Sequence, residues 1–138
     1  MTARDTRGFT LVELLTVVGL IGIISAIALP SLLRARMSGN EASAIASLRA
    51  ISSAQSAFAA SCGSGFYAPT LVNLSTPPTV GGGDGFIGTD LSTDPSVKSS
   101  YTITLTAGAA AVGAPASCNG VAAGTVVSTY FASAAPTA

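Results

Sequence analysis

Few side chains in this sequence are suited to covalent or metal chemistry. The chain contains no histidine and two cysteines, Cys62 and Cys118. Without histidine the usual Cys–His and Ser–His nucleophile pairs cannot form, and two thiolates alone make a poor zinc site. We therefore expect no catalytic residue, no metal site and no cofactor, and the sequence does not predict an enzyme.

Three aspartates, Asp84, Asp90 and Asp94, are the remaining candidates for binding a cation. Carboxylates are ligands that calcium prefers, but aspartates are also common as solvated side chains of turns. We favour turn residues here because the spacing is loose. The neighbouring run Gly81–Gly85 is not a phosphate-binding loop, because neither a Lys-Ser/Thr pair nor a helix pattern follows it.

One carboxylate, Glu13, lies inside an apolar run from Phe9 to Leu33 that carries no other charge. As a helix this run would be about 37 Å long, which is enough to cross a hydrocarbon core of about 30 Å. An ionisable side chain in a membrane-spanning segment is costly and is a candidate functional residue. We expect Glu13 to pair with a positive group of a neighbouring subunit. The alternative is a side chain that reaches the lipid headgroups and has no role.

Arginines flank the apolar run on both sides. Arg4 and Arg7 favour a cytoplasmic N-terminus, whereas Arg34 and Arg36 weaken that assignment because they follow the far end. The run is too long for a secretory signal peptide, and no small-x-small cleavage signal follows it. The sequence therefore predicts a single-pass membrane protein.

The helical pattern continues past the apolar run. Residues 41–61 are rich in alanine and serine and contain no proline, and Gly63 and Gly65 are expected to end the helix near Cys62. Positions spaced alternately by four and three form one face, which we expect to pack against a sheet: Ala44, Leu48, Ile51, Gln55, Phe58 and Cys62.

The C-terminal part of the chain alternates turns with short strands. Turn residues dominate positions 63–100, and Tyr101–Thr106 alternates apolar and polar side chains as a half-buried antiparallel strand does. We expect a second strand at Thr125–Phe131, a further short strand near Phe86–Leu91, and a loop from Ala107 to Gly120. A helix packed against such a sheet predicts an α+β fold.

Residues 4–37 resemble the N-terminal region of type IV pilins and of the related type II secretion pseudopilins. The residues that carry the resemblance are Gly8, Phe9, Thr10-Leu11-Val12, Glu13 and Pro30. The resemblance implies a pilin-like fold, in which a long N-terminal helix, half of it transmembrane, packs against a small antiparallel sheet. It also implies a type IVa-like leader, with a prepilin peptidase that cleaves between Gly8 and Phe9 and methylates the new amine of Phe9.

The resemblance divides the chain into a leader peptide (1–8), a transmembrane and assembly helix (9–36) and a globular head (37–138). It implies a structural subunit that is inserted in the inner (cytoplasmic) membrane and polymerises with identical subunits into an extracellular filament, with Glu13 acting in assembly. Its other partners would be the prepilin peptidase and a pilus or secretion assembly machinery. The alternatives are the major pseudopilin of a type II secretion system and a single-span membrane-anchored binding module. Motility, adhesion, DNA uptake and secretion remain open as roles of the filament.

Charge is scarce along the whole chain. Charged residues make up 9% of the sequence, and removal of residues 1–8 leaves four basic and five acidic side chains. No basic patch is available, so we expect no nucleic acid partner. A surface dominated by small and hydroxyl-bearing residues either packs against copies of itself or carries modifications such as glycans.

The filament and the exported head lead to two further expectations. In the filament we expect the helix to break around Gly19, Gly22 and Pro30, because these residues weaken helical hydrogen bonding and pilin filaments have an extended stretch at the matching place. In an oxidising compartment Cys62 and Cys118 tend to form a disulfide, worth about 4 kcal/mol in the chain-entropy model. The alternative is a pair of buried free thiols.

Overall fold

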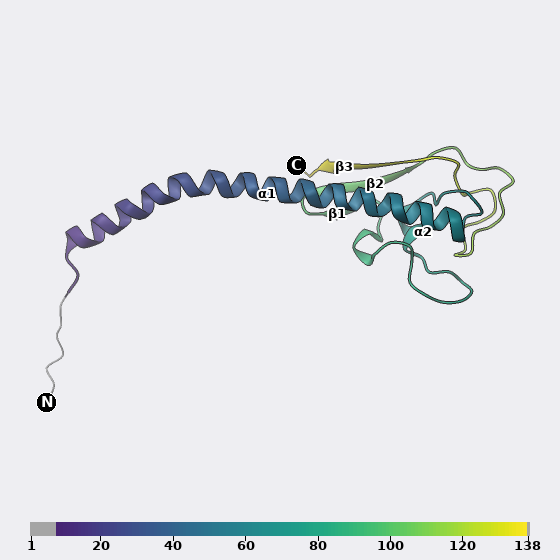
Figure 1. Ribbon diagram of the computed structural model, residues 1–138, viewed down its shortest axis with the longest axis horizontal. Helices are drawn as coiled ribbons and strands as arrows, with labels where there is room; N and C mark the ends of the chain where they lie inside the picture. Colours follow the sequence, from purple (N-terminus) through teal and green to yellow (C-terminus); the bar gives the residue numbers. More distant parts are fainter. Residues whose placement is uncertain (1–7, 138) are drawn as a thin grey trace, which may run out of the picture. The chain divides into compact units, whose positions relative to one another are not determined.

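The computed structural model describes residues 8–137, so the leader predicted for residues 1–8 lies outside the described residues except for Gly8. The chain divides after Ser38 into two compact units. A long apolar N-terminal helix and a small antiparallel sheet confirm the predicted α+β fold class (Figure 1). The elements are the helices α1 (Leu11–Ser61) and α2 (Leu71–Ser75), the 3-10 helix η1 (Thr89–Leu91), and the strands β1 (Ser96–Lys98), β2 (Tyr101–Ala107) and β3 (Tyr130–Pro136).

In the first unit, α1 is an uninterrupted helix whose side chains are almost all exposed. It passes through Gly19, Gly22 and Pro30 without a break. The helix break predicted at these residues is therefore absent from the isolated subunit. Relative to alanine, a glycine destabilises a helix by about 1 kcal/mol and a proline by about 3 kcal/mol. A break would leave backbone amides and carbonyls without hydrogen-bond partners, and these residues supply none. A break in the assembled filament stays a prediction.

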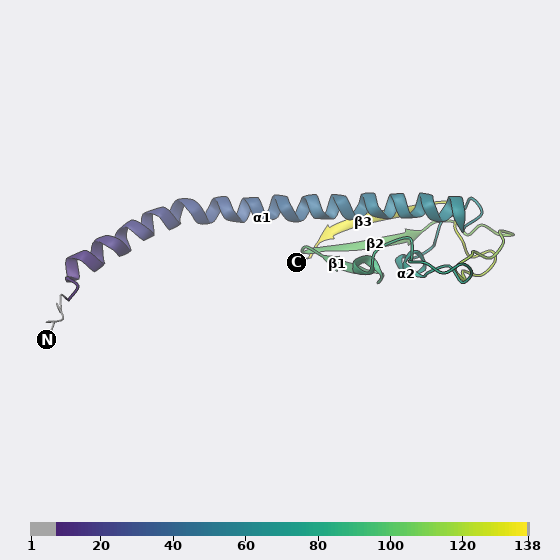
Figure 2. The ribbon, with the colours of Figure 1, turned by 60° about the horizontal axis from the view of Figure 1, so that its bottom comes forward.

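In the second unit, one face of α1 packs against the sheet (Figure 2). The predicted face is confirmed in its main positions, although Leu48 is only half-buried and the small residues Ser47 and Ala54 share the contact. The buried residues of α1 are Ala44, Ser47, Ile51, Ala54, Gln55 and Phe58. Among them, Ile51, Ala54 and Phe58 share the hydrophobic core with Ile103 and Leu105 of β2.

A turn with two glycines ends α1 at Ser61, close to the predicted stop. The amide of Gly63 donates to the carbonyl of Phe58 over 2.7 Å, and Gly65 has a φ of 90°, a conformation that other residues rarely adopt. A Cβ at Gly63 would lie 2.2 Å from the carbonyl oxygen of Phe66, so only glycine fits there.

The three strands form an antiparallel sheet in the order β1-β2-β3. Strand β2 ends one residue beyond the predicted strand, with Ile103 and Leu105 buried and Tyr101 half-buried. Ile103 pairs with Ala134 and Leu105 pairs with Ala132 of β3. Both alanines lie against the hydrophobic core, so β3 contributes small side chains where β2 contributes large ones.

The other two predicted strands are wrong in position. The strand expected at Thr125–Phe131 begins only at Tyr130, because Val127 is buried in the preceding loop, where its backbone forms an isolated bridge with Tyr67. The segment expected as a strand near Phe86–Leu91 leads into η1 instead. The third strand is the short β1, which follows η1 and pairs with β2.

A carboxylate that is distant in the sequence contributes to the position of the short helix α2, which was not predicted from the sequence. The side chain of Thr70 caps α2 by accepting the amide of Asn73. Asp94 accepts the amide of Leu71 at 3.2 Å with one oxygen and the amide of Leu105 at 3.3 Å with the other. Asp94 therefore joins the start of α2 to the middle of β2.

Candidate processing and assembly site

The first residues of the described chain form a helix cap. Gly8, Phe9 and Thr10 precede α1 and are exposed, and the helix begins at Leu11. The side-chain oxygen of Thr10 accepts the amide of Glu13 at 3.2 Å, and the hydroxyl of Thr10 donates to the carboxylate of Glu13 at 3.3 Å. The predicted cleavage site therefore lies in non-helical chain immediately before the cap.

This arrangement is a variant of the capping box. In a capping box, the side chain of an N-cap Ser or Thr accepts the backbone amide of a Glu three residues later, and the Glu side chain accepts the N-cap amide. Here the carboxylate of Glu13 accepts the Thr10 hydroxyl, whereas the usual capping box has it accept the N-cap amide. This cap was not predicted from the sequence. The signal was present, because Thr10-Leu11-Val12-Glu13 has the S/T-x-x-E spacing directly before an apolar run.

The position of Glu13 suits its charge in the isolated chain. It lies in the first turn of α1, where a negative side chain interacts favourably with the helix dipole. Phe9 lies before the first helical residue, so the one-turn spacing that would bring residues i and i+4 together within a helix does not apply to the pair Phe9–Glu13. The pairing of Glu13 with a neighbouring subunit stays a prediction.

Within residues 8–137, the apolar part of α1 packs against no other segment. Its most apolar window of 18 residues has a mean hydropathy of 2.4 and no buried residue, so the helix is long and apolar enough to cross a membrane. The exposed fractions of Leu11, Leu15 and Ile27 are 80%, 68% and 76%. An exposed apolar surface of this extent indicates contact with lipid or with other protein chains.

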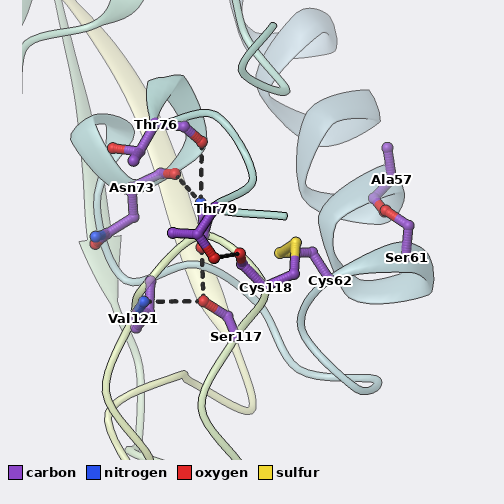
Figure 3. The surroundings of a disulfide bond; sticks show 10 residues. Ala57, Ser61, Cys62, Asn73, Thr76, Thr79, Ser117, Cys118 and Val121 are labelled. Atoms are coloured by element: carbon purple, nitrogen blue, oxygen red, sulfur yellow. Dashed lines mark hydrogen bonds between the residues drawn. A yellow bond between two sulfur atoms is a disulfide. The ribbon is translucent and has the colours of Figure 1, made fainter. Parts of the chain in front are cut away.

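Cys62 and Cys118 form a disulfide in the structure, with a Cα–Cα distance of 4.9 Å (Figure 3). Cys62 follows the last residue of α1, and its carbonyl accepts the amide of Cys118. The carbonyl of Cys118 accepts both the amide and the hydroxyl of Thr79. The bridge therefore connects the end of α1 to the loop that contains Cys118. The hydrogen bonds of Cys118 connect this loop in turn to the one that contains Thr79.

Hydrogen bonds hold the Cys118 loop against α2 as well. The side-chain amide of Asn119 donates to the carbonyl of Asn73 at 2.6 Å and to that of Thr76 at 3.2 Å. The hydroxyl of Ser117 accepts the amide of Val121 at 3.0 Å. Asn119 and Ser117 are buried, so these bonds satisfy polar groups that would otherwise be costly.

Two of the three aspartates considered as cation ligands have partners of their own. Asp90 forms an ion pair with Lys98, and its hydrogen bond to that ammonium lowers the pKa of the Asp90 carboxyl. Asp94 binds two backbone amides, and Asp84 is exposed in the glycine-rich loop. Among residues 8–137, the structure gathers no group of three His, Cys, Asp or Glu side chains that could hold a metal ion.

Comparisons with known proteins found a family model and a relative that match this chain. A family model described as the prokaryotic N-terminal methylation motif matches residues 3–29. The type IV major pilin protein PilA of Myxococcus xanthus (strain DK1622) is 42% identical over 52 residues, which are 38% of this chain and 24% of the relative. The match thus spans about a quarter of that relative's length. No solved structure matches this chain.

The family-model match falls on the region that carries the resemblance, and both matches support the type IV pilin family. The family-model match ends within the apolar segment and includes Gly8, Phe9 and Glu13. Gly19 and Gly22 also lie within the matched residues, whereas Pro30 follows them. The family-model match does not extend to the head.

Proposed function

We propose that this chain, whose N-terminal region is that of the type IV pilin family, is a structural subunit of a type IV pilus-like filament. The precursor is inserted in the inner (cytoplasmic) membrane, and a prepilin peptidase cleaves it between Gly8 and Phe9 and methylates Phe9. The observation that carries the proposal is an exposed apolar helix whose first residues lie within the match to the methylation motif. Cleavage and methylation are the steps that prepare this helix for assembly.

Assembly of such a subunit is association without catalysis. The apolar half of α1 leaves the lipid and packs against the same segment of identical subunits, where it stays out of water. A heterologous contact of this kind, repeated along an axis, produces an open filament. Because this segment is already out of water in the lipid, van der Waals packing against the same segment of other subunits favours the association, and the hydrophobic effect contributes little.

Glu13 supplies a directional contact that apolar packing lacks. Cleavage creates an amine at Phe9, and pairing of that amine with Glu13 of an adjacent subunit offsets part of the cost of burying both charges. A subunit displaced along the axis would leave both groups unpaired, so the pair fixes the register of the filament. The hydroxyl of Thr10 binds Oε2 of Glu13 in the isolated chain, and the other carboxylate oxygen, Oε1, is the acceptor we assign to this pair.

The head is suited to an exposed position on a filament. A disulfide joins the end of α1 to the C-terminal loops, and bridges of this kind are typical of oxidising compartments. The surface carries few charges, and the ion pair Asp90–Lys98 neutralises two of them. Surfaces formed by small, uncharged side chains can approach one another closely when subunits pack side by side.

The second candidate function is the major pseudopilin of a type II secretion system, which shares the processing signal and the helix. The name of the matched relative, a type IV major pilin, favours the pilus. The disulfide of the head favours it as well. The neighbouring genes distinguish the two functions, since pilus and secretion machineries have different accessory components.

The proposal is tested by deleting the gene and examining the cells by electron microscopy. We expect surface filaments to disappear on deletion and to return when the gene is restored. Loss of protein secretion with unchanged surface filaments would instead support the pseudopilin. Unchanged filaments and unchanged secretion would contradict both functions.

A further inference from the structure

The bond that the peptidase is expected to cleave lies outside helix α1. Gly8 and Phe9 are non-helical, and Phe9 has an exposed fraction of 80%. The helix begins only at Leu11, although the apolar run already begins at Phe9. Thr10 lies between the cleavage site and the helix, and its side chain forms the cap.

We propose that Thr10 is a positioning residue for leader cleavage, because its side chain stops α1 at Leu11 and keeps the Gly8–Phe9 bond in non-helical chain. This inference rests on the proposed processing of the precursor. A peptidase has to reach the carbonyl carbon of the bond that it cleaves. A carbonyl that takes part in helical hydrogen bonds is less accessible to a catalytic centre than one in extended chain.

The location of the cap near a membrane determines what its loss would do. The first amides of α1 have no partner within the helix, and Thr10 satisfies that of Glu13. Without this acceptor, amides close to the lipid are satisfied most readily if the helix adds a turn at its N-terminus, because unpaired amides there are costly. The added turn would use the carbonyls of Gly8 and Phe9, which include the carbonyl of the bond to be cleaved.

Gly8 and Thr10 act in the same direction in this account. Glycine is among the poorest helix formers, so it opposes extension of α1 toward the leader. Gly8 therefore has a conformational role in addition to any preference of the peptidase for a small side chain. Thr10 adds a hydrogen-bonded stop that glycine alone does not provide.

Two threonines allow the effect of losing the cap to be distinguished from the effect of losing any hydroxyl group in α1. Thr16 lies in the same helix, and its hydroxyl donates to the backbone carbonyl of Glu13 at 2.9 Å without contributing to the cap. Thr10→Val and Thr16→Val remove the same atom and keep a β-branched side chain. Thr10→Ser retains the oxygen that accepts the Glu13 amide.

The experiment measures cleavage of full-length precursors, reconstituted in lipid bilayers, by purified prepilin peptidase. We expect Thr10→Val to lower kcat/KM by about fivefold, the ratio that corresponds to about 1 kcal/mol for a lost cap. Thr10→Ser and Thr16→Val should stay within about twofold of the wild type. Carbon chemical shifts of Gly8 and Phe9 should move toward helical values in Thr10→Val alone.

Cleavage of Thr10→Val at the wild-type rate would overturn the inference. Slow cleavage with unchanged, non-helical shifts at Gly8 and Phe9 would also overturn it, because Thr10 would then act by touching the peptidase directly. A wild-type precursor that is not cut between Gly8 and Phe9 would instead refute the proposed processing itself. The two failures are therefore distinguishable in one set of measurements.

Discussion

The hydroxyl of Thr10 donates to the carboxylate of Glu13 over 3.3 Å, so the acid of the apolar segment is bound to the start of its own helix. The same threonine oxygen accepts the amide of Glu13. Two residues of the processing motif thus have a defined structural role before any partner is present. The carboxylate is held in the first turn of α1, four residues after Phe9, the residue whose amine would be released on cleavage.

Glu13→Ala separates processing from assembly. The substitution makes the membrane segment more apolar, and the side-chain oxygen of Thr10 still accepts the amide at position 13, so insertion and cleavage should be unchanged. Assembly should fall sharply because the amine of Phe9 loses its partner. The measurement is the yield of sheared filaments relative to mature subunit in the membrane. Wild-type yield would show that the pair is not required.

Glu13→Gln is the matched control for the charge. Glutamine keeps an acceptor for the hydroxyl of Thr10 but carries no charge, so the cap remains while the ion pair is lost. We expect filament yield close to that of the alanine variant. A yield close to that of the wild type would mean that the hydrogen bond of residue 13 matters and its charge does not.

Replacement of Gly8 by phenylalanine should leave the full-length precursor in the membrane. A Cβ at this position meets no other atom within 4 Å, so the new side chain causes no clash in the described structure. Immunoblots of membrane fractions distinguish the precursor from the mature subunit by size. Gly39→Ala, at a helical glycine that is equally free of neighbours, should be processed normally.

Cys118→Ala should lower the free energy of unfolding of the head by about 4 kcal/mol, because it opens a loop with a sequence separation of 56. Denaturant titration of the purified protein measures the change. Mild reduction of the wild type should produce a shift of the same sign. Recovery of both cysteines as alkylated thiols from the native protein would contradict the bridge.

Asp94→Ala should lower the free energy of unfolding by about 1–3 kcal/mol, because two backbone amides lose their acceptor. Asp84→Ala is the matched control, since Asp84 is exposed in the glycine-rich loop, and it should change stability by less than about 0.5 kcal/mol. Thermal unfolding followed by circular dichroism compares the two variants. Equal effects would show that the contacts of Asp94 contribute nothing.

The parts of the fold that depend on neighbouring residues were predictable from the sequence. The apolar run, the glycine turn after α1 and the alternation around Ile103 and Leu105 are local patterns, and each predicts its element. The processing motif is equally local, and the comparisons support the family that it indicated. The capping box at Thr10 and Glu13 is also local, and it was missed although its spacing is visible.

The remaining elements depend on contacts between residues that are distant in the sequence. β3 contains Ala132, Ser133, Ala134 and Ala135, which have little preference for strands. Ala132 and Ala134 lie against the core, where they pair with Leu105 and Ile103 of β2. α2 has five residues and depends on Asp94, which lies 23 positions from the amide that it accepts. No pattern within either segment indicates these partners.

The central claim is that the mature subunit begins at Phe9 and polymerises through its N-terminal helix. The most direct measurement is the intact mass of subunits from sheared and purified filaments, with fragmentation of the N-terminal peptide. The account predicts a chain that starts at Phe9 and carries one methyl group on the terminal amine. A filament subunit that starts at any other residue, or a protein that is absent from the filaments, would contradict it.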